Sequence, residues 1–307
     1  MDETIAVFTK NRVNPAYDAA RLGADRTAAR CGARTLHFVP GRPDDVDEQI
    51  ALVERAITSH PDAVVFVPVH LTALDASVRN LNAASIPVVN YLNRLAHGRF
   101  VSFVGSDDYR LARDVAACLF RHLGGRGEVV VIEGVLGAVT NRDRLHGFRD
   151  EAARWPGICI ADSRCGDYRR DAGERAMNAL LAAVPRIDGV LAANDDMALG
   201  ALSALDAAGH GGGVPVVGVN AIPEAIAALK DGRLLATADF DAMKIGCIAT
   251  EAAIRHLRGE TVPAEIILPV SIVDRSNCAP WDCPLEAREC PRWSEVIRIR
   301  QPGAPVS

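Results

Sequence analysis

The chain has 307 residues, of which 49% are hydrophobic and 24% are charged, and its formal net charge at pH 7 is −5. This length predicts two domains rather than one small module, and the composition excludes a disordered polypeptide. The acidic balance argues against nucleic acid as the partner, and no apolar run approaches the roughly 18 residues that a membrane helix needs. The sequence therefore predicts a globular protein that folds on its own.

Short β-branched runs alternate with longer stretches of helical periodicity along most of the chain. This alternation is typical of βα units built around parallel sheets. Ten strands are predicted, at 4–8, 35–39, 63–67, 87–91, 100–105, 129–133, 157–161, 189–193, 214–219 and 235–240. The helices predicted between and after them are 15–31, 44–59, 72–84, 108–123, 141–154, 170–184, 195–208, 222–230 and 242–258.

Capping and turn residues support these boundaries. Asn14 and Pro15 supply an N-cap and a proline for the first helical position, and Gly32 follows the same helix as its C′ residue. The Gly-Gly-Arg-Gly stretch at 124–127 ends a later helix before a new strand, so the opening architecture is expected to repeat from about residue 128. The pattern predicts two similar α/β lobes.

Polar and aromatic side chains gather where the predicted strands end. Ligands of open parallel sheets bind outside the carboxyl ends of the strands. Amides donate and accept hydrogen bonds, carboxylates accept them, and aromatic rings cover apolar ring faces, so this set suits a sugar. The candidate ligand-binding residues are Lys10, Asn14, Tyr17, His70, Asn90, Asn93, Arg94, Asp107, Thr140, Arg144, Tyr168, Asn194, Asn220, Asp239 and Phe240.

Each candidate also has an ordinary structural explanation. Asn and Asp residues after strands are common N-caps and turn formers. Lys10 could be an exposed charge at a strand end, and a single histidine such as His70 is more often a binding residue than a general base. The predicted sugar site depends on the whole set, which comes from both lobes.

Motifs for catalysis and for cofactors are missing from the sequence. The first strand is not followed by G-x-G-x-x-G, and neither a P-loop nor a G-x-S-x-G elbow occurs. These absences predict that the protein is not an enzyme and uses no cofactor. A sugar-modifying enzyme on the same fold is kept as an alternative, with Asp107 and Asp239 as its acid and base.

The eight cysteines lie at 31, 118, 159, 165, 247, 278, 283 and 290, without the C-x-x-C pairs that favour zinc. Most are expected to be small core residues, and no metal site is predicted. The spacings 159/165 and 278/283/290 permit local disulfides in an oxidising compartment.

Four segments carry a family resemblance: Thr4-Ile5-Ala6-Val7 with Asn14-Pro15, the stretch 141–148, the stretch 194–202, and Val216-Val217-Gly218-Val219-Asn220. In this order they resemble the type I periplasmic sugar-binding proteins of the ribose-binding branch, and more distantly the effector-binding core of the lactose-repressor family. The resemblance covers about residues 4–275. It implies two Rossmann-like lobes with parallel sheets, joined by a three-strand hinge.

What the resemblance implies for function is capture of a monosaccharide between closing lobes and its delivery to the membrane permease of an ABC importer. The implied N-terminal lobe is 1–104 with 241–269, and the C-terminal lobe is 105–240 with 270–307. The protein is expected to be periplasmic, with its signal peptide removed, and to act as a monomer without nucleic acid. The implied ligand clamp comprises Asn14, Tyr17, Asn93, Arg94, Arg144, Tyr168, Asn194 and Asn220, with a polar residue near Phe240.

Four positions depart from the ribose type. Ala16 replaces an aromatic residue, Val67 replaces an asparagine, and Asn93 and Asn220 stand where aspartate is usual. Amides in place of carboxylates remove charge-assisted hydrogen bonds, each about twice as strong as a neutral one, and leave Arg94 and Arg144 less neutralised. We therefore expect a different sugar, a polyol or a sugar acid as the ligand.

Two alternatives remain open. The chain could be the sugar-sensing core of a lactose-repressor-type regulator that lacks its DNA-binding head, because such a core would share the sugar-site residues. Residues after about 275 extend beyond the ribose-type ending and hold two of the three tryptophans. Trp281 is expected either to reach the site as a lid or to pack on the second lobe.

Overall fold

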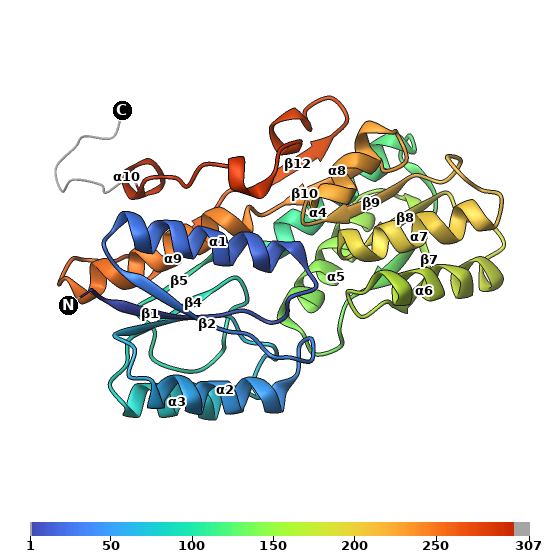
Figure 1. Ribbon diagram of the computed structural model, residues 1–307. Helices are drawn as coiled ribbons and strands as arrows, with labels where there is room; N and C mark the ends of the chain where they lie inside the picture. The colour runs from blue at the N-terminus through green and yellow to red at the C-terminus, as the bar shows by residue number, and fades with distance from the viewer. Residues whose placement is uncertain (1, 298–307) are drawn as a thin grey trace. The chain divides into compact units, whose positions relative to one another are not determined.

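The computed structural model describes residues 2–297, which form two α/β units (Figure 1). Unit 1 comprises residues 2–105, Ala242–Leu268 and 288–297, and unit 2 comprises Ser106–Asp241 and Pro269–Ala287. The chain therefore passes from one unit to the other after residues 105, 241, 268 and 287. The first three passages adjoin the lobe boundaries expected from the sequence.

Unit 1 is built on a six-stranded sheet that is covered on both faces. In spatial order its strands are β11 (Glu265–Leu268), β5 (Ser102–Ser106), β4 (Val88–Tyr91), β3 (Ala63–Phe66), β1 (Thr4–Phe8) and β2 (Arg34–Phe38). The pairs from β5 to β2 are parallel. Helices α1 (Pro15–Arg30) and α9 (Ala242–Leu257) cover one face, and α2 (Val46–Thr58) and α3 (Asp75–Ala83) cover the other (Figure 1).

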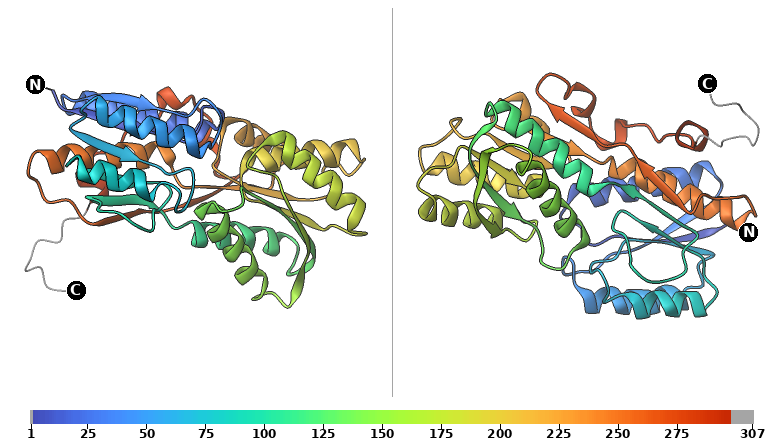
Figure 2. Two further views of the ribbon diagram at one scale, coloured as in Figure 1. Left: turned by 90° about the horizontal axis from the view of Figure 1, so that it is seen from below. Right: turned by 180° about the vertical axis from the view of Figure 1, so that it is seen from behind.

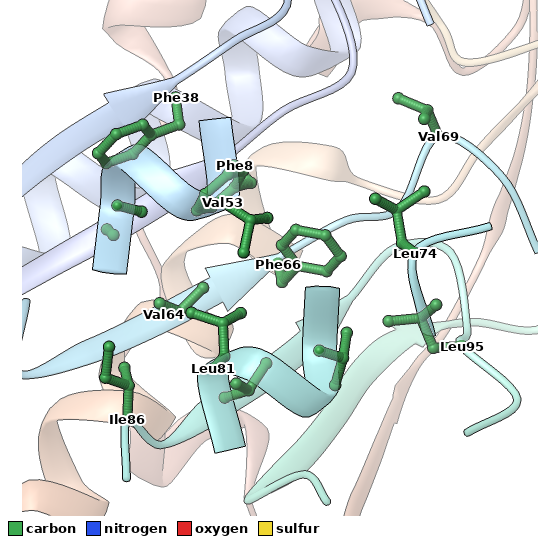
Figure 3. Packing of buried hydrophobic residues seen from close by; sticks show 14 residues of the cluster. Phe8, Phe38, Val53, Val64, Phe66, Val69, Leu74, Leu81, Ile86 and Leu95 are labelled. Atoms are coloured by element: carbon green, nitrogen blue, oxygen red, sulfur yellow. The ribbon is translucent and has the colours of Figure 1, made fainter. Parts of the chain in front are cut away.

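The core of unit 1 lies between the sheet and the layer of α2 and α3. Figure 3 shows Phe8, Phe38 and Phe66 pointing from the strands toward Val53 and Leu81 of the two helices. The Phe8 ring centroid lies 5.0 Å from that of Phe38 and 5.0 Å from that of Phe66. Parallel strands with helices on both faces are buried throughout, which explains why β1 and β3 are continuous apolar runs.

On the opposite face, α1 and α9 approach so closely that only glycine fits at two contacts. A Cβ atom on Gly23 would lie 2.3 Å from the carbonyl oxygen of Met243, and one on Gly246 would lie 2.3 Å from that of Ala20. Because the opposing atoms are backbone, a rotamer change cannot relieve either contact.

We expect Gly246→Ala to destabilise the protein by about 1–2 kcal/mol. The added methyl group must push α9 away from α1, which outweighs the roughly 1 kcal/mol by which alanine favours a helix over glycine. Urea unfolding measures the difference. The control is Gly213→Ala, since the nearest atom to its Cβ is the His210 carbonyl oxygen at 3.5 Å. Equal midpoints for wild type and Gly246→Ala would disprove the close contact.

Unit 2 repeats the architecture of unit 1. Its strands are, in spatial order, β12 (Ser271–Asp274), β10 (Ala236–Asp239), β9 (Val216–Val219), β8 (Gly189–Ala192), β6 (Arg126–Glu133) and β7 (Gly157–Cys165). All pairs are parallel except β10 with β12. Its helices are α4 (Asp108–His122), α5 (Val139–Ala152), α6 (Arg170–Ala183), α7 (Asp195–Ala207) and α8 (Pro223–Lys230). Figure 2 shows α6 and α7 side by side in both views.

The two sheets have the same strand order, so the predicted pair of similar α/β lobes is confirmed. Each of the ten predicted strands and nine predicted helices is present, with ends that shift by a few residues. Asn14 caps α1 by accepting a hydrogen bond from the Ala16 backbone N–H, and Gly32 follows with φ of 70°, as expected. The sequence analysis missed β11, β12 and the short helix α10 (Trp293–Val296).

The segment 288–297 corrects one expectation. It was expected in the C-terminal lobe, but it lies in unit 1, where the Trp293 side chain is buried. The Arg255 guanidinium of α9 lies 5.0 Å from the centroid of the Trp293 ring. Burial of this large indole against unit 1 explains the placement. Trp281 belongs to unit 2 instead.

Candidate functional site

Arg144 is the most heavily engaged candidate residue of unit 2. It lies on α5 with only 4% of its surface exposed. Its Nε donates to Asp108 Oδ1 at 2.8 Å, its Nη2 lies 2.7 Å from the same oxygen, and its Nη1 donates to the Ala193 carbonyl at 2.6 Å. The guanidinium also faces the Phe240 ring, 5.8 Å from its centroid. The start of α4 and the ends of β8 and β10 therefore meet around one cation.

Asp108, at the start of α4, is the residue that the candidate set lacked. Burial raises the pKa of its carboxyl, and the Arg144 guanidinium acts in the opposite direction. Each charge of the pair therefore compensates the other, since burial of either charge alone in this site would be unfavourable. Asp107, which was in the candidate set, is exposed and caps α4 by accepting from the Arg110 backbone N–H at 2.9 Å.

Tyr168 and Asn194 form a second part of the same site. The Tyr168 hydroxyl lies 3.1 Å from Thr140 Oγ1, and Asn194 Nδ2 donates to the Tyr168 carbonyl at 3.1 Å. Asn194 Oδ1 meanwhile accepts from the Met197 backbone N–H at 3.0 Å and caps α7. The Tyr168 ring packs on Gly134, where a Cβ would lie 2.1 Å from the ring. Asn194 is therefore an N-cap, the ordinary structural explanation for an asparagine after a strand, and its role in ligand binding stays a prediction.

Asp239 ends β10, the last parallel strand of unit 2, and Phe240 follows it. The Asp239 side chain is 7% exposed. Its Oδ1 accepts from the Asp241 backbone N–H at 2.8 Å, and its Oδ2 accepts from Trp281 Nε1 at 2.7 Å. Trp281 therefore packs on the second unit through a direct bond to a candidate residue. The acidic group of Asp239 is held by donors, an arrangement that suits binding better than acid–base exchange.

Asn220 begins the loop after β9 in an unusual backbone conformation, with φ of 122°. Its backbone N–H donates to the Ala238 carbonyl at 2.8 Å. Asp195 holds this loop in place through two hydrogen bonds. Its Oδ2 accepts from the Ile222 backbone N–H at 3.0 Å, and its Oδ1 accepts from Thr237 Oγ1 at 2.6 Å. Asp195 is a second acidic residue that the candidate set lacked.

In unit 1, Lys10 and Asn14 stand at the carboxyl end of β1. Lys10 is 3% exposed and forms an ion pair with Asp44 Oδ1 at 3.1 Å, so it is not an exposed strand-end charge. Asn11 Nδ2 holds the other Asp44 oxygen at 3.0 Å. Tyr17 lies half-buried in the first turn of α1, three residues after the cap.

The candidates after β3 and β4 are largely engaged with their own loops. Asn90 Nδ2 donates to the carbonyls of Phe66 and Asn93 at 3.0 and 2.9 Å, and its Oδ1 accepts from the Leu95 N–H at 3.0 Å. His70 Nδ1 accepts from the N–H groups of the turn that follows it. Asn93 is buried beside them.

Arg94 turns toward the edge of the sheet. Its guanidinium lies 3.9 Å from the centroid of the Phe103 ring and pairs with Glu265 of β11. Roles of Asn90, Asn93, His70 and Arg94 in ligand binding stay predictions.

Within residues 2–297, no helix has both the length and the apolar character needed to cross a bilayer. In the same part of the chain, no three His, Cys, Asp or Glu side chains are grouped so that they could hold a metal ion.

The chain is similar to known proteins over most of its length. The family model described as "Periplasmic binding protein domain" matches residues 5–261. The chain is 38% identical over 281 residues to the D-ribose/D-allose-binding protein of Pseudomonas aeruginosa, covering 88% of each chain. It is 30% identical to the ribose import binding protein of Bacillus subtilis, covering 88% of this chain and 86% of that protein.

A solved structure shares the fold as well. The ABC transporter periplasmic solute-binding protein of Actinobacillus succinogenes, crystallised with D-allose, superposes with a TM-score of 0.86 at 28% identity. The match covers 90% of this chain and 99% of that one, so part of the present chain has no counterpart there.

Proposed function

The chain belongs to the periplasmic binding protein domain family, and we propose on this basis that it captures a neutral sugar or polyol between its two units and delivers it to the permease of an ABC importer. Members of this family are solute-binding proteins of ABC transport that work outside the cytoplasm, and they are not enzymes. The regulator alternative has less support, since import binding proteins match 88% of the chain.

The observation that carries the proposal is the group of side chains around Arg144 in unit 2. A buried guanidinium, the amide of Asn194 and the rings of Tyr168 and Phe240 converge at the carboxyl ends of neighbouring strands. Polar groups held in fixed directions next to aromatic faces match vicinal hydroxyls and the apolar face of a sugar ring. We propose that Asn14, Tyr17 and Asn93 of unit 1 complete the site when the units close.

A neutral ligand is favoured by the way in which the candidate cations are paired. Lys10 is bound to Asp44, Arg94 to Glu265 and Arg144 to Asp108. A sugar acid would have to compete with each of these carboxylates. The departures from the ribose type leave room for sugars other than ribose and for polyols. Monomeric action and removal of an export signal are included in the proposal as implied by the family.

A thermal-shift screen tests the proposal with D-ribose, D-allose, xylitol, myo-inositol and D-glucuronate. A ligand at a hundredfold excess over its Kd stabilises the native state by about 2.7 kcal/mol, which corresponds to roughly 5 °C for a protein of this size. We expect such a shift with at least one neutral compound and none with D-glucuronate. A shift with D-glucuronate alone would overturn the neutral-ligand proposal, and a flat screen on folded protein would count against the sugar site itself.

A further inference from the structure

The C-terminal segment 288–297, which lies beyond the family match, is fixed to α1 and α9 of unit 1. Arg26 Nη1 donates to the Arg288 carbonyl at 2.8 Å, and Arg30 Nη2 donates to the Pro291 carbonyl at 3.1 Å. Trp293 is buried against Arg255 a little further along. The backbone on both sides of Cys290 is therefore held in place.

This packing brings two cysteines together that are distant in sequence. Cys247 is a fully buried residue of α9 that faces α1, where a Cβ on Gly23 would lie 3.0 Å from its sulfur. The side chains of Cys247 and Cys290 lie close enough for their thiols to interact directly, and both lie beside Thr27 of α1. Both cysteines are free thiols in the structure.

Three other cysteines of the spacings 159/165 and 278/283/290 are oriented differently. Cys165 Sγ donates to the Gly134 carbonyl at 3.2 Å, and Cys278 and Cys283 donate to the carbonyls of Arg275 and Pro280 at 3.7 and 3.5 Å. Cys165 Sγ also donates to Asp167 Oδ1 at 3.0 Å, so these three sulfurs point to oxygen atoms rather than to another thiol.

The environment of Cys290 favours thiol–disulfide exchange. The neighbouring Cys247 thiol and the guanidinium groups of Arg30 and Arg26 lower the pKa of Cys290, which favours its thiolate form. The Cys290 side chain, together with burial, raises the pKa of Cys247, which therefore holds its proton more tightly. A thiol with a pKa near the ambient pH is the most effective attacking group, and Cys290 is the more accessible of the two.

We propose that Cys247 and Cys290 form a disulfide in the exported protein and that this bond fastens the C-terminal segment to α9. The Cys290 thiolate attacks a disulfide oxidant and releases one thiol of that oxidant, and the sulfur of Cys247 then loses its proton and attacks Cys290, displacing the second. Two electrons and two protons pass to the oxidant, which leaves as two thiols. An oxidising compartment outside the cytoplasm supplies such oxidants.

Peptide mapping of the full chain tests the proposal without any ligand. Reduced, folded protein is incubated with a mixture of oxidised and reduced glutathione at neutral pH, its remaining thiols are blocked in urea with N-ethylmaleimide, and it is digested with trypsin without reduction. Trypsin places Cys247 in peptide 245–255 and Cys290 in peptide 289–292, whereas Cys278 and Cys283 share peptide 276–288. We expect 245–255 joined to 289–292, and release of both by dithiothreitol.

Variants and melting temperatures check the assignment. Cys290→Ser is expected to abolish the cross-link, and the double variant Cys278→Ser/Cys283→Ser is expected to retain it. The bond closes a loop of about 40 residues, so the oxidised wild type is expected to melt roughly 5 °C or more above the reduced form. Maleimide on both Cys247 and Cys290 of the wild type, or a cross-link that joins either to another cysteine, would overturn the proposal. Both results come from the wild type, so a variant that fails to fold does not obscure them.

Discussion

Arg144→Ala is expected to weaken sugar binding by about 100-fold or more, which corresponds to about 3 kcal/mol. The guanidinium binds Asp108 and the Ala193 carbonyl and lies over Phe240 in the proposed site. Its removal takes away the donors proposed to meet the sugar hydroxyls and leaves the buried Asp108 carboxylate without its counter-charge. Truncating one partner of a buried, hydrogen-bonded charge pair typically costs 2–5 kcal/mol or more.

Arg113→Ala is a matched control for this prediction. Arg113 of α4 also bridges to α5, with its Nη2 2.9 Å from Glu151 Oε2. Glu151 keeps two further donors when Arg113 is removed, namely Arg154 and Trp155. We therefore expect Arg113→Ala to bind sugar with wild-type affinity.

Isothermal titration calorimetry with the neutral compound that gives the largest thermal shift measures both variants. The lost counter-charge is also expected to lower the free energy of unfolding of Arg144→Ala, so circular dichroism must first establish that it is folded at the titration temperature. Arg144→Lys keeps the positive charge but cannot reproduce three directed N–H groups, and we expect an intermediate affinity. Wild-type affinity in folded Arg144→Ala would exclude Arg144 from the ligand clamp.

The sequence predicted the fold well because buried parallel strands consist of short β-branched runs, which alternate with longer amphipathic stretches. The run at 4–8, for example, is β1 without any shift of its ends. Strands β11 and β12 were not predicted because each includes exposed positions in place of a continuous buried run, and neither is followed by a long helix. Edge strands of this kind depend on the neighbouring strand more than on their own composition.

The residue types of the candidate site could be predicted, but the partners of those residues could not. Asp107 and Asp108 both follow β5, and nothing in their spacing indicates that Asp107 caps the helix while Asp108 turns inward to Arg144. That choice depends on the packing of α4 against α5. The contact of Cys247 with Cys290 could not be predicted either, because it requires the C-terminal segment to return to unit 1.

The stability of the protein is expected to fall by about 2–3 kcal/mol between pH 5 and pH 8 because of Asp195 alone. Asp195 is fully buried, and burial raises its pKa from 3.8 to about 7, while its hydrogen bonds with Thr237 and Ile222 oppose the rise only in part. The folded protein therefore holds this proton up to about pH 7, whereas the unfolded chain releases it near pH 4. Where the folded state binds more protons than the unfolded state, stability decreases as the pH rises.

Asp195→Asn isolates this contribution. The amide oxygen can accept from the Ile222 N–H and the amide nitrogen can donate to Thr237 Oγ1, so the variant retains both bonds without an ionisable group. Urea titrations at pH 5 and pH 8 give the free energy of unfolding of both proteins. The stability of Asp195→Asn relative to wild type is expected to be about 2–3 kcal/mol higher at pH 8 than at pH 5. Asp206→Asn, which alters a surface carboxylate of the same helix beside Arg233, serves as the control.

The outcome also bears on the binding site, because Asp195 adjoins Asn194 and anchors the loop that carries Asn220. Ionisation of Asp195 places a buried negative charge next to two proposed ligand contacts. We therefore expect the pH dependence of sugar affinity to flatten in Asp195→Asn together with that of stability. Parallel stability profiles for wild type and Asp195→Asn would instead show that the buried carboxyl is already ionised at pH 5, with its two hydrogen bonds sufficient to hold the charge.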